Sequence, residues 1–504
     1  MSFKNRWRIE GTLTTITPLH IGSGATTILD KIKDEKKDRK ADIAAVATDH
    51  GNKPYIPGAT LKGNMRAYLR QSGLDKSSKT EFEKLFGSDD PKGENSCGGA
   101  LEFLNATGSS PSDYDGNNIP YWNNMRLTGV SASAVIDRQT RTAANQKLFY
   151  TEYVPKGISF KVVITGQDIE DNELALLLYA LDGFKDKDKK VKLGAGEADG
   201  WGEFEWKLDA VRYIDADKVK AWLKSPNTVG YEMQGAEKKN EVELLARTIK
   251  ANSSNVILTL DITLTFNSPF LVNDTSRDRE FKDKENGKIY ADHYPLVEIS
   301  GNVLLPSKSI RGAFRSQAER ILRTIGGDKG DKAACLIHDK TKTCKTVYEV
   351  SKVKKSCPAC QVFGLSGWRS PVQFSDFTYV KNGEIKRQQF VAIDRFTGGG
   401  VDGAKFDADY AYRPTLRGTM TIDLNRLNVG GTGEWGLGLI AFTLRDLMEG
   451  DITLGFGAAK GYGDCRAKIA LEGLNELKKK LSSLNEWHKK LELHINLQSA
   501  RGTV

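Results

Sequence analysis

The sequence predicts an α+β fold of two similar domains in tandem, each a sheet of the split βαβ kind with helices on one face. Each half opens with alternating β-branched residues, at positions 9–18 and 258–269, a period-2 pattern typical of half-buried strands. Each half then continues into a helical stretch, at 67–70 and 316–323. Both halves share the order strand, loop, helix, strands, irregular excursion, helix, strand, which favours such a sheet.

Short motifs recur in the same order in both halves, which predicts two copies of one domain. Corresponding glycines of the first motif pair lie 249 positions apart, aspartates of the second pair 257, and glycines of the third pair 261. Phe86 and Phe363 lie 277 apart, which a cysteine-bearing insertion before Phe363 explains. So little drift in an ordered set indicates gene duplication. The motif pairs are 55–66 with 304–315, 135–138 with 392–395, and 193–202 with 454–463.

The domain boundaries follow from the repeat and from a polar stretch between the halves. We expect a helix at 216–223 just before this stretch. Near the end, residues 474–493 have the Leu, Lys and Glu spacing of an amphipathic helix. That helix either docks on a neighbouring protein or caps its own domain, and the pattern favours the cap. The expected units are a first domain at 1–225, a linker at 226–254, a second domain at 255–475 and a helical tail at 476–504.

Composition restricts the classes of protein. The 504 residues carry a formal net charge of +9, which fits a polyanionic partner and fits equally a basic soluble enzyme. No apolar run is long enough to span a membrane, and residues 1–10 lack the apolar core of a signal peptide. We therefore expect a cytoplasmic protein without membrane contact, whose six cysteines do not form structural disulfides.

Four of the six cysteines cluster in one segment of the second half. Cys335, Cys344, Cys357 and Cys360 are joined by a histidine, His338, and Cys357 and Cys360 form a Cys-x-x-Cys pair. This spacing suits tetrahedral zinc, because two ligands on one tight turn leave two others to close the site. The four cysteines are the favoured ligands, with His338 as a substitute for Cys335. A structural zinc would staple a lysine-rich excursion of low apolar content, and the alternative is a set of reduced free thiols.

Cationic residues repeat at the start of the helix that follows the first motif. The first copy carries Lys62 and Arg66, and the second carries Lys308, Arg311 and Arg315. Peptide N–H groups and cationic side chains near a helix start both favour a phosphate. The alternative is a solvated helix face, which is common for a single Lys or Arg. The repeated pattern favours contact with a nucleic-acid backbone, which fixes register and reads no base.

Two glycine-rich loops have the same glycine spacing, and they include Gly194 and Gly196 in the first half and Gly455 and Gly457 in the second. Without side chains, backbone N–H groups can approach phosphates directly. The alternative is a pair of tight turns. Neither loop has the Gly-x-x-x-x-Gly-Lys-Ser/Thr pattern, which argues against a nucleotide-binding enzyme.

An Ile-Asp-Arg motif recurs in the two halves. Arg138 and Arg395 can stack on a base or hold a phosphate, and Phe396 offers a stacking face. For Asp137 and Asp394, a structural pair between the aspartate and the arginine is as good an interpretation as contact with RNA.

Taken together, the motifs at 57–66 and 136–138 and the two glycine loops resemble the RAMP superfamily. Within that superfamily, residues 357–364 resemble a motif of the backbone subunit of type III CRISPR effector complexes. The tandem arrangement is similar to subtypes III-D and III-E, in which such subunits are fused. The resemblance implies two RNA-recognition-motif or ferredoxin-like domains with finger insertions and thumb β-hairpins, at about 131–153 and 389–412. The Ile-Asp-Arg motifs would then lie at the bases of the thumbs, where an Asp–Arg pair could hold each hairpin shut. It also implies CRISPR guide RNA, complementary target RNA and other type III effector subunits as partners.

The resemblance further implies cleavage of target RNA with the help of an acidic residue after the first strand. Asp292 and Asp42 lie at this place in the two halves, 250 positions apart. Asp292 is the closer match, because Asp42 lacks the proline expected nearby. Such a carboxylate can hold Mg²⁺ or another divalent ion, or orient a 2′-hydroxyl for in-line attack. The alternative for each is an exposed loop carboxylate. No histidine recurs in both halves, which disfavours a two-histidine ribonuclease.

The expected function is therefore that of a guide-RNA-binding subunit that holds the guide–target duplex and acts as a metal-dependent endoribonuclease in the assembled complex. One alternative is a purely structural backbone subunit without cleavage. Another is an endoribonuclease that processes precursor guide RNA, which calls for a basic or histidine active site that the sequence does not offer.

Overall fold

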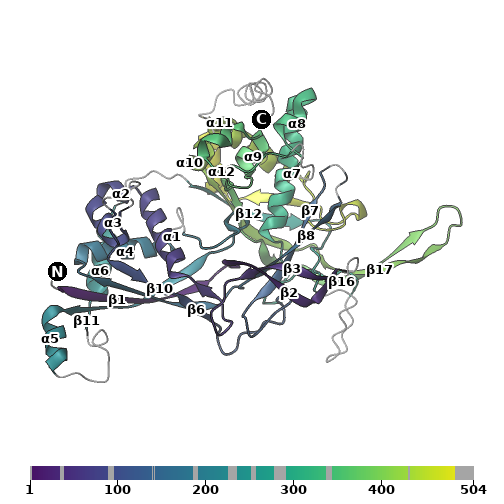
Figure 1. Ribbon diagram of the computed structural model, residues 1–504. Helices are drawn as coiled ribbons and strands as arrows, with labels where there is room; N and C mark the ends of the chain where they lie inside the picture. Colours follow the sequence, from purple (N-terminus) through teal and green to yellow (C-terminus); the bar gives the residue numbers. More distant parts are fainter. Residues whose placement is uncertain are drawn as a thin grey trace.

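The computed structural model resolves two bodies in one chain, each with its own hydrophobic core. The first core takes its residues from positions 7–246 and the second from 258–477. Figure 1 shows the bodies side by side, the first coloured purple to teal and the second green to yellow. No helix of the described part is long and apolar enough to cross a membrane. The described residues are 3–34, 39–88, 96–138, 140, 142–185, 191–224, 235–250, 257–276, 291–336, 343–429 and 432–482.

The first sheet is built around β1 (Asn5–Thr15), which pairs antiparallel with β9 (Ser159–Gln167) on one side and β10 (Phe204–Asp215) on the other. Alternate residues of β1 are buried, as its period-2 sequence predicts. The strand order is β11-β10-β1-β9-β6-β4, and β5 also pairs with β9. The shorter strands are β4 (Tyr55–Ile56), β5 (Leu101–Phe103), β6 (Ala106–Ser109) and β11 (Ala236–Glu237).

The second sheet repeats this plan. Its central strand β12 (Ile257–Phe266) pairs antiparallel with β18 (Thr415–Asp423) and β19 (Cys465–Ile469), as β1 pairs with β9 and β10. The short strands β14 (Val372–Phe374) and β15 (Thr378–Lys381) both pair with β18, where β5 and β6 pair with β9. The prediction of two tandem ferredoxin-like domains is confirmed by this shared topology.

Helices cover one face of each sheet (Figure 1). The equivalent helices α1 (Gly58–Gln71) and α7 (Ser307–Gly326) each begin directly after a proline. They therefore start nine residues before the helical stretches predicted at 67–70 and 316–323, because the proline ends the extended segment and begins the helix. The further helices are α2 (Leu74–Ser77), α3 (Lys79–Phe86), α4 (Asp171–Asp182), α5 (Ala216–Lys224), α8 (Gly330–Ala333), α9 (Pro358–Phe363), α10 (Leu424–Val429), α11 (Gly433–Glu449) and α12 (Leu471–Ser482).

Each domain carries a long β-hairpin where a thumb was expected. The first thumb is β7 (Gly129–Ile136) with β8 (Ala143–Tyr153), and the second is β16 (Glu384–Ile393) with β17 (Gly400–Tyr412). β7 and β8 also join β2 (Gly22–Asp34) and β3 (Arg39–Val46) in a sheet of order β2-β3-β8-β7. Figure 1 shows the first thumb beside α7, whereas the second thumb projects away from the body.

The expected linker at 226–254 is only in part a connection. Within it, β11 extends the first sheet, and helix α6 (Lys239–Thr248) packs on α4. Val242 and Ala246, one helical turn apart, are buried in the first core. Residues 239–248, where the sequence suggested part of a linker, therefore form a helix packed on the first domain, because their polar composition includes a narrow apolar stripe.

The last described helix, α12, packs on β12 of its own domain, with Leu477 buried in the second core. Over the residues that the structure describes, this agrees with a helix that caps its own domain. It begins three residues before the predicted segment, and residues 483–504 lie outside the described part of the chain.

Candidate RNA interface and metal site

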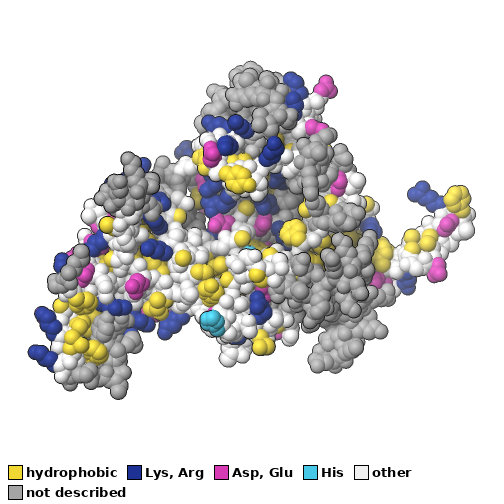
Figure 2. Space-filling view, viewed as in Figure 1, with side chains coloured by type: hydrophobic (Ala, Val, Ile, Leu, Met, Phe, Trp, Pro, Cys, Tyr) yellow, Lys and Arg dark blue, Asp and Glu magenta, His cyan; other side chains and the backbone are white. Residues whose placement is uncertain are grey.

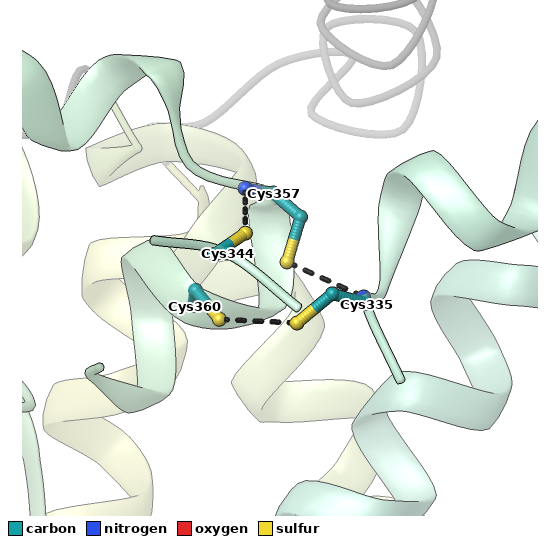
Figure 3. A group of neighbouring side chains, drawn as sticks. All are labelled: Cys335, Cys344, Cys357 and Cys360. Atoms are coloured by element: carbon teal, nitrogen blue, oxygen red, sulfur yellow. Dashed lines mark hydrogen bonds between the residues drawn. The ribbon is translucent and has the colours of Figure 1, made fainter. Parts of the chain in front are cut away.

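The four clustered cysteines come together in the second domain (Figure 3). Their sulfur atoms all lie within 4.8 Å of one another. Cys335 follows α8, Cys357 and Cys360 stand at the start of α9, and Cys344 comes from the excursion between them. The Sγ atoms of Cys335 and Cys360 are 3.5 Å apart, and the Cys357 amide donates a hydrogen bond to Cys344 Sγ at 3.2 Å. His338, the predicted substitute ligand, lies outside the described residues.

The cysteine cluster has the chemistry of a structural zinc site, four soft sulfur donors in a closed and largely buried arrangement. Hydrogen bonds from the other three thiols lower the pKa of Cys335, and its thiolate raises the pKa of Cys344, Cys357 and Cys360. More than one negative charge is therefore unfavourable without a cation among the sulfurs. The four-cysteine cluster could thus hold zinc, which requires its ligands as thiolates.

The two glycine loops have the same backbone conformation. The corresponding glycines at 194, 196, 200 and 202 and at 455, 457, 461 and 463 all have positive φ, between 74° and 97°. A Cβ atom on Gly202 would lie 2.1 Å from the carbonyl oxygen of Leu193, and one on Gly463 would lie 2.2 Å from that of Leu454. The turn itself therefore requires these glycines.

The side chains between the glycines differ in charge. The first loop carries Glu197 and Asp199 where the second carries Ala458 and Lys460. Asp199 accepts a hydrogen bond from Arg311 on α7 at 2.7 Å, and its carbonyl oxygen accepts one from the Ser307 hydroxyl. Glu197 forms an ion pair with Arg369 of the second domain. The first loop is thus packed against the second domain of the same chain.

The first thumb docks on the same helix. The Lys308 ammonium donates to Ser131 Oγ, the Ala132 carbonyl oxygen and Ser133 Oγ, at 2.5, 2.6 and 2.8 Å. Burial lowers the pKa of Lys308 to about 8, although Asp199 and another nearby carboxylate oppose the shift. Together with the glycine loop, these contacts form a polar junction between the domains.

The domain junction also contains a buried carboxylate that pairs with arginines of both domains. Glu319 on α7 is fully buried and pairs with Arg315 at 2.8 Å, with Arg138 of the first thumb at 3.1 Å and with Arg323 at 3.7 Å. Arg315 also donates to the Gly364 carbonyl oxygen and to Cys360 Sγ. Four of the predicted phosphate-binding cations, Arg138, Lys308, Arg311 and Arg315, therefore contact acceptors within the chain.

The remaining predicted cations lie at the two outer ends. Lys62 on α1 makes no hydrogen bond or ion pair with the residues that the structure describes. Arg66, one turn on, donates weakly to the Gly87 carbonyl oxygen at 3.4 Å. Arg395 and Phe396 lie at the tip of the second thumb and not at its base as predicted, because β16 ends at Ile393 and β17 begins at Gly400. Arg395 is exposed there, and Phe396 is fully exposed. Figure 2 shows hydrophobic and basic side chains at the free end of the projecting thumb.

The aspartates of the Ile-Asp-Arg motifs hold the hairpin turns. Asp394 Oδ1 accepts from the amides of Phe396 and Thr397 at 2.7 and 2.9 Å, and Asp137 accepts from the Thr140 amide at 3.1 Å. These carboxylates therefore stabilise the hairpin turns through backbone amides, where the sequence suggested pairs with the arginines.

Asp292 lies at the base of the second thumb. Its Oδ2 accepts a hydrogen bond from the Asp407 amide at 2.8 Å, and the next residue, His293, pairs in parallel with Ala408 of β17. In the first domain, β3 pairs in parallel with β8 at Ile43, the residue after Asp42. The two segments are therefore equivalent in topology, as their sequence separation predicts. The side chain of Asp42 lies outside the described part.

Sequence reasoning missed a cluster of aromatic rings around His293, the residue that follows Asp292. The Phe390 and Phe406 rings of the second thumb stack at 4.8 Å, and the His293 ring lies 4.6 Å from Phe456 of the second glycine loop. The Lys460 ammonium lies over these rings, 5.0 Å from the Phe456 centroid. Burial lowers the pKa of His293, with Asp292 opposing and Lys460 adding to the shift. Three distant segments build this group, so no local motif announces it.

Comparison with known proteins agrees with the fold and the repeated motifs. The family model of the RAMP superfamily matches residues 12–205 and again residues 263–466. The chain therefore belongs to the RAMP superfamily and contains two copies of its domain. It is also 26% identical over 224 residues to the CRISPR system Cms endoribonuclease Csm3 of Enterococcus italicus. That stretch covers 42% of this chain and 94% of the relative, so nearly all of the relative corresponds to less than half of this chain.

Replacing Glu319 with Gln is expected to lower the free energy of unfolding of the second domain by about 3 kcal/mol, because the change leaves the partly buried arginines around it without their shared carboxylate. Urea titration followed by circular dichroism measures the effect. Exposed Glu472 on α12 provides the matched control, since Glu472→Gln should change stability by less than about 0.5 kcal/mol. An equal effect of both changes would contradict the assigned role of Glu319.

Purified protein is expected to contain one zinc ion per chain, measured by inductively coupled plasma mass spectrometry. Cys357→Ser should lose the metal, because a hydroxyl is a poor replacement for a thiolate ligand. Cys465→Ser is the control, since Cys465 is buried in β19 away from the cluster and its loss should leave the metal content unchanged. Wild-type protein without metal would refute the zinc assignment.

Proposed function

We propose that this chain is a guide-RNA-binding backbone subunit of a type III CRISPR effector complex, and that it cleaves the paired target RNA beside Asp292. The observation that carries the proposal is the placement of Asp292 at the base of a projecting thumb in a chain with two RAMP domains. The similarity to a protein named as an endoribonuclease of a CRISPR system supports the same reaction. The partners proposed are guide RNA, target RNA and the other subunits of the complex.

The proposed RNA contacts are those that remain accessible. Lys62 and Arg66 on α1 and the second glycine loop, with Gly455 and Gly457, would hold the sugar–phosphate backbone. At the second thumb, Arg395 and Phe396 would stack on an unpaired base, for which a fully exposed phenylalanine is well suited. Such contacts leave the base edges of the guide free to pair, as a variable guide requires.

The junction residues have a different proposed role. Arg138, Lys308 and Arg311 fix the second domain against the first, and Arg315 holds the Glu319 carboxylate with which Arg138 pairs. Gly194 and Gly196 shape the loop that docks there. Because a phosphate contact would break these buried pairs, we propose that they set the spacing of the two domains along the guide.

At the proposed cleavage site, the Asp292 carboxylate is held in place by the hydrogen bond that its Oδ2 accepts from the Asp407 amide. It would orient the 2′-hydroxyl of the target for in-line attack on the adjacent phosphorus. The 2′-oxygen forms a bond to phosphorus while the bond from phosphorus to the 5′-oxygen breaks, which gives a 2′,3′-cyclic phosphate. The 2′-hydroxyl loses its proton to solvent, and the leaving 5′-oxygen takes up a proton from solvent. Mg²⁺ or another divalent ion at this carboxylate would stabilise the phosphate charge.

A structural subunit without cleavage is the second candidate. The hydrogen bond from the Asp407 amide favours it, because that bond gives Asp292 a purely structural task in holding its segment on β17. The two functions differ in a simple way, since only the cleavage proposal requires a charged oxygen at this position.

Asp292→Asn is therefore the decisive change. Asparagine keeps the acceptor for the Asp407 amide, so the fold and guide binding should be unchanged, while target cleavage should fall at least about 100-fold. The reconstituted complex is incubated with labelled target RNA and Mg²⁺, and the products are separated on a denaturing gel. Asp402→Asn, on the exposed part of the second thumb, is the control and should cut normally.

The same assay with Asp42→Asn and with the double variant counts the active sites, because each inactive site removes one product. If the Asp292→Asn complex cuts at the wild-type rate and positions, cleavage beside Asp292 is excluded. A wild-type complex that binds target but never cuts supports the structural candidate instead.

A further inference from the structure

The junction between the two domains is a head-to-tail contact. The glycine loop and thumb of the first domain meet the α7 face of the second. Because the domains are copies of one another, the chain also presents the same two kinds of surface at its outer ends. The α1 face corresponds to the α7 face, and the second glycine loop and thumb correspond to the first. A head-to-tail contact of this kind can in principle repeat without limit from chain to chain.

The first ion pair of the junction becomes a pair of like charges at the outer ends. Inside the chain, Asp199 of the first glycine loop pairs with Arg311 of α7 at 2.7 Å. The residue at the Asp199 position in the second loop is Lys460, and the residue at the Arg311 position on α1 is Lys62. A second copy of the chain docked in the same way would place one lysine against another.

The second ion pair also becomes a pair of like charges. Inside the chain, Arg138 of the first thumb pairs with buried Glu319 of α7 at 3.1 Å. Arg395 takes the place of Arg138 at the tip of the second thumb, whereas Arg70 takes the place of Glu319 on α1. The same docking would therefore bring two arginines together.

The third polar contact is lost without a replacement. Lys308 joins α7 to the first thumb through three hydrogen bonds, and the corresponding residue of α1 is Ala59, which has nothing to donate. The backbone frame is nevertheless conserved between the two surfaces, since the glycine loops share their dihedral angles and both helices follow a proline. The charges that select a partner have changed on this shared frame.

We propose that the outer ends of this chain reject a second copy of the chain, so that the junction formed inside it cannot be repeated between chains. Like charges placed against each other disfavour an interface, and two of the three ion pairs of the junction become like-charge pairs. The third, between Glu197 and Arg369, loses its acid, because Ala458 takes the place of Glu197. The neighbour that fits beside Lys460 and Arg395 is a different protein, with carboxylates at the positions of Arg311 and Glu319. The proposal rests on the duplication and the junction, and not on the proposed reaction with RNA.

Two substitutions restore both ion pairs between chains. In the double variant K460D/R70E, the new carboxylate at position 460 of one copy would face Lys62 of the next, and Arg395 would face the new carboxylate at position 70. Sedimentation velocity of the nucleic-acid-free full chain at low ionic strength measures the association. Wild type should remain one species at all concentrations. The variant should form larger species that grow with concentration and dissociate in salt, because exposed ion pairs are screened.

Two control variants separate charge pairing from other effects. K460A/R70A removes the repulsion without adding attraction, and should associate at least about tenfold more weakly than K460D/R70E. Adding R395E to K460D/R70E places two acids together and should return the chain to a single species. Circular dichroism and thermal unfolding of each variant confirm that the fold is retained.

Either of two results would overturn the proposal. One is a wild-type chain that associates end to end and is weakened by K460D. The other is a folded K460D/R70E variant that stays monomeric like the wild type. Failure of target cleavage in the complex would leave this measurement unaffected, because no RNA takes part in it.

Discussion

The arrangement of this molecule depends on one buried carboxylate. Glu319 of α7 forms ion pairs with two arginines of its own helix and with one from the thumb of the other domain. Arg315 carries the connection further, since the same guanidinium contacts a sulfur of the cysteine cluster. These contacts couple the placement of the first thumb to the orientation of α7 and to the edge of the cysteine cluster. Replacing any one of the charged side chains would leave its partner buried without an opposite charge, which is strongly unfavourable.

The duplicated fold shows which features a backbone requires and which are free to change. Glycines with positive φ recur at every corresponding position of the two loops, because side chains rarely adopt this conformation. At Gly202 and Gly463, a neighbouring carbonyl oxygen also leaves no room for a Cβ atom. The residues between them changed from acidic to neutral or basic, which altered what each loop can contact without altering its shape. One loop became part of a protein junction, and the other carries Lys460 beside Asp292.

Sequence reasoning reached the fold and the cysteine cluster because each of these leaves a local or repeated pattern, and it reached the two thumbs through the family resemblance. It did not reach α6, whose two buried residues are hidden in a polar stretch. Nor did it reach the partners of Arg138, Lys308 and Arg311, because repetition shows that positions correspond and does not show what each one touches. A comparison of charges between the copies would have been informative, since Asp199 and Lys460 occupy one position with opposite signs.

This asymmetry follows from joining two copies in one chain. Because the two domains are covalently linked, the first thumb stays close to α7. Side chains at this contact can therefore form buried ion pairs, which a transient contact would expose to water. No such link acts on the second thumb, whose tip exposes Phe396 completely. A surface without a permanent partner is stable in water only if its backbone groups are hydrogen-bonded and its charges stay solvated. In the second thumb, the backbones of β16 and β17 pair with each other, and the side chains of β16 are largely exposed. The first copy can therefore serve rigidity while the second stays free to recognise a separate molecule.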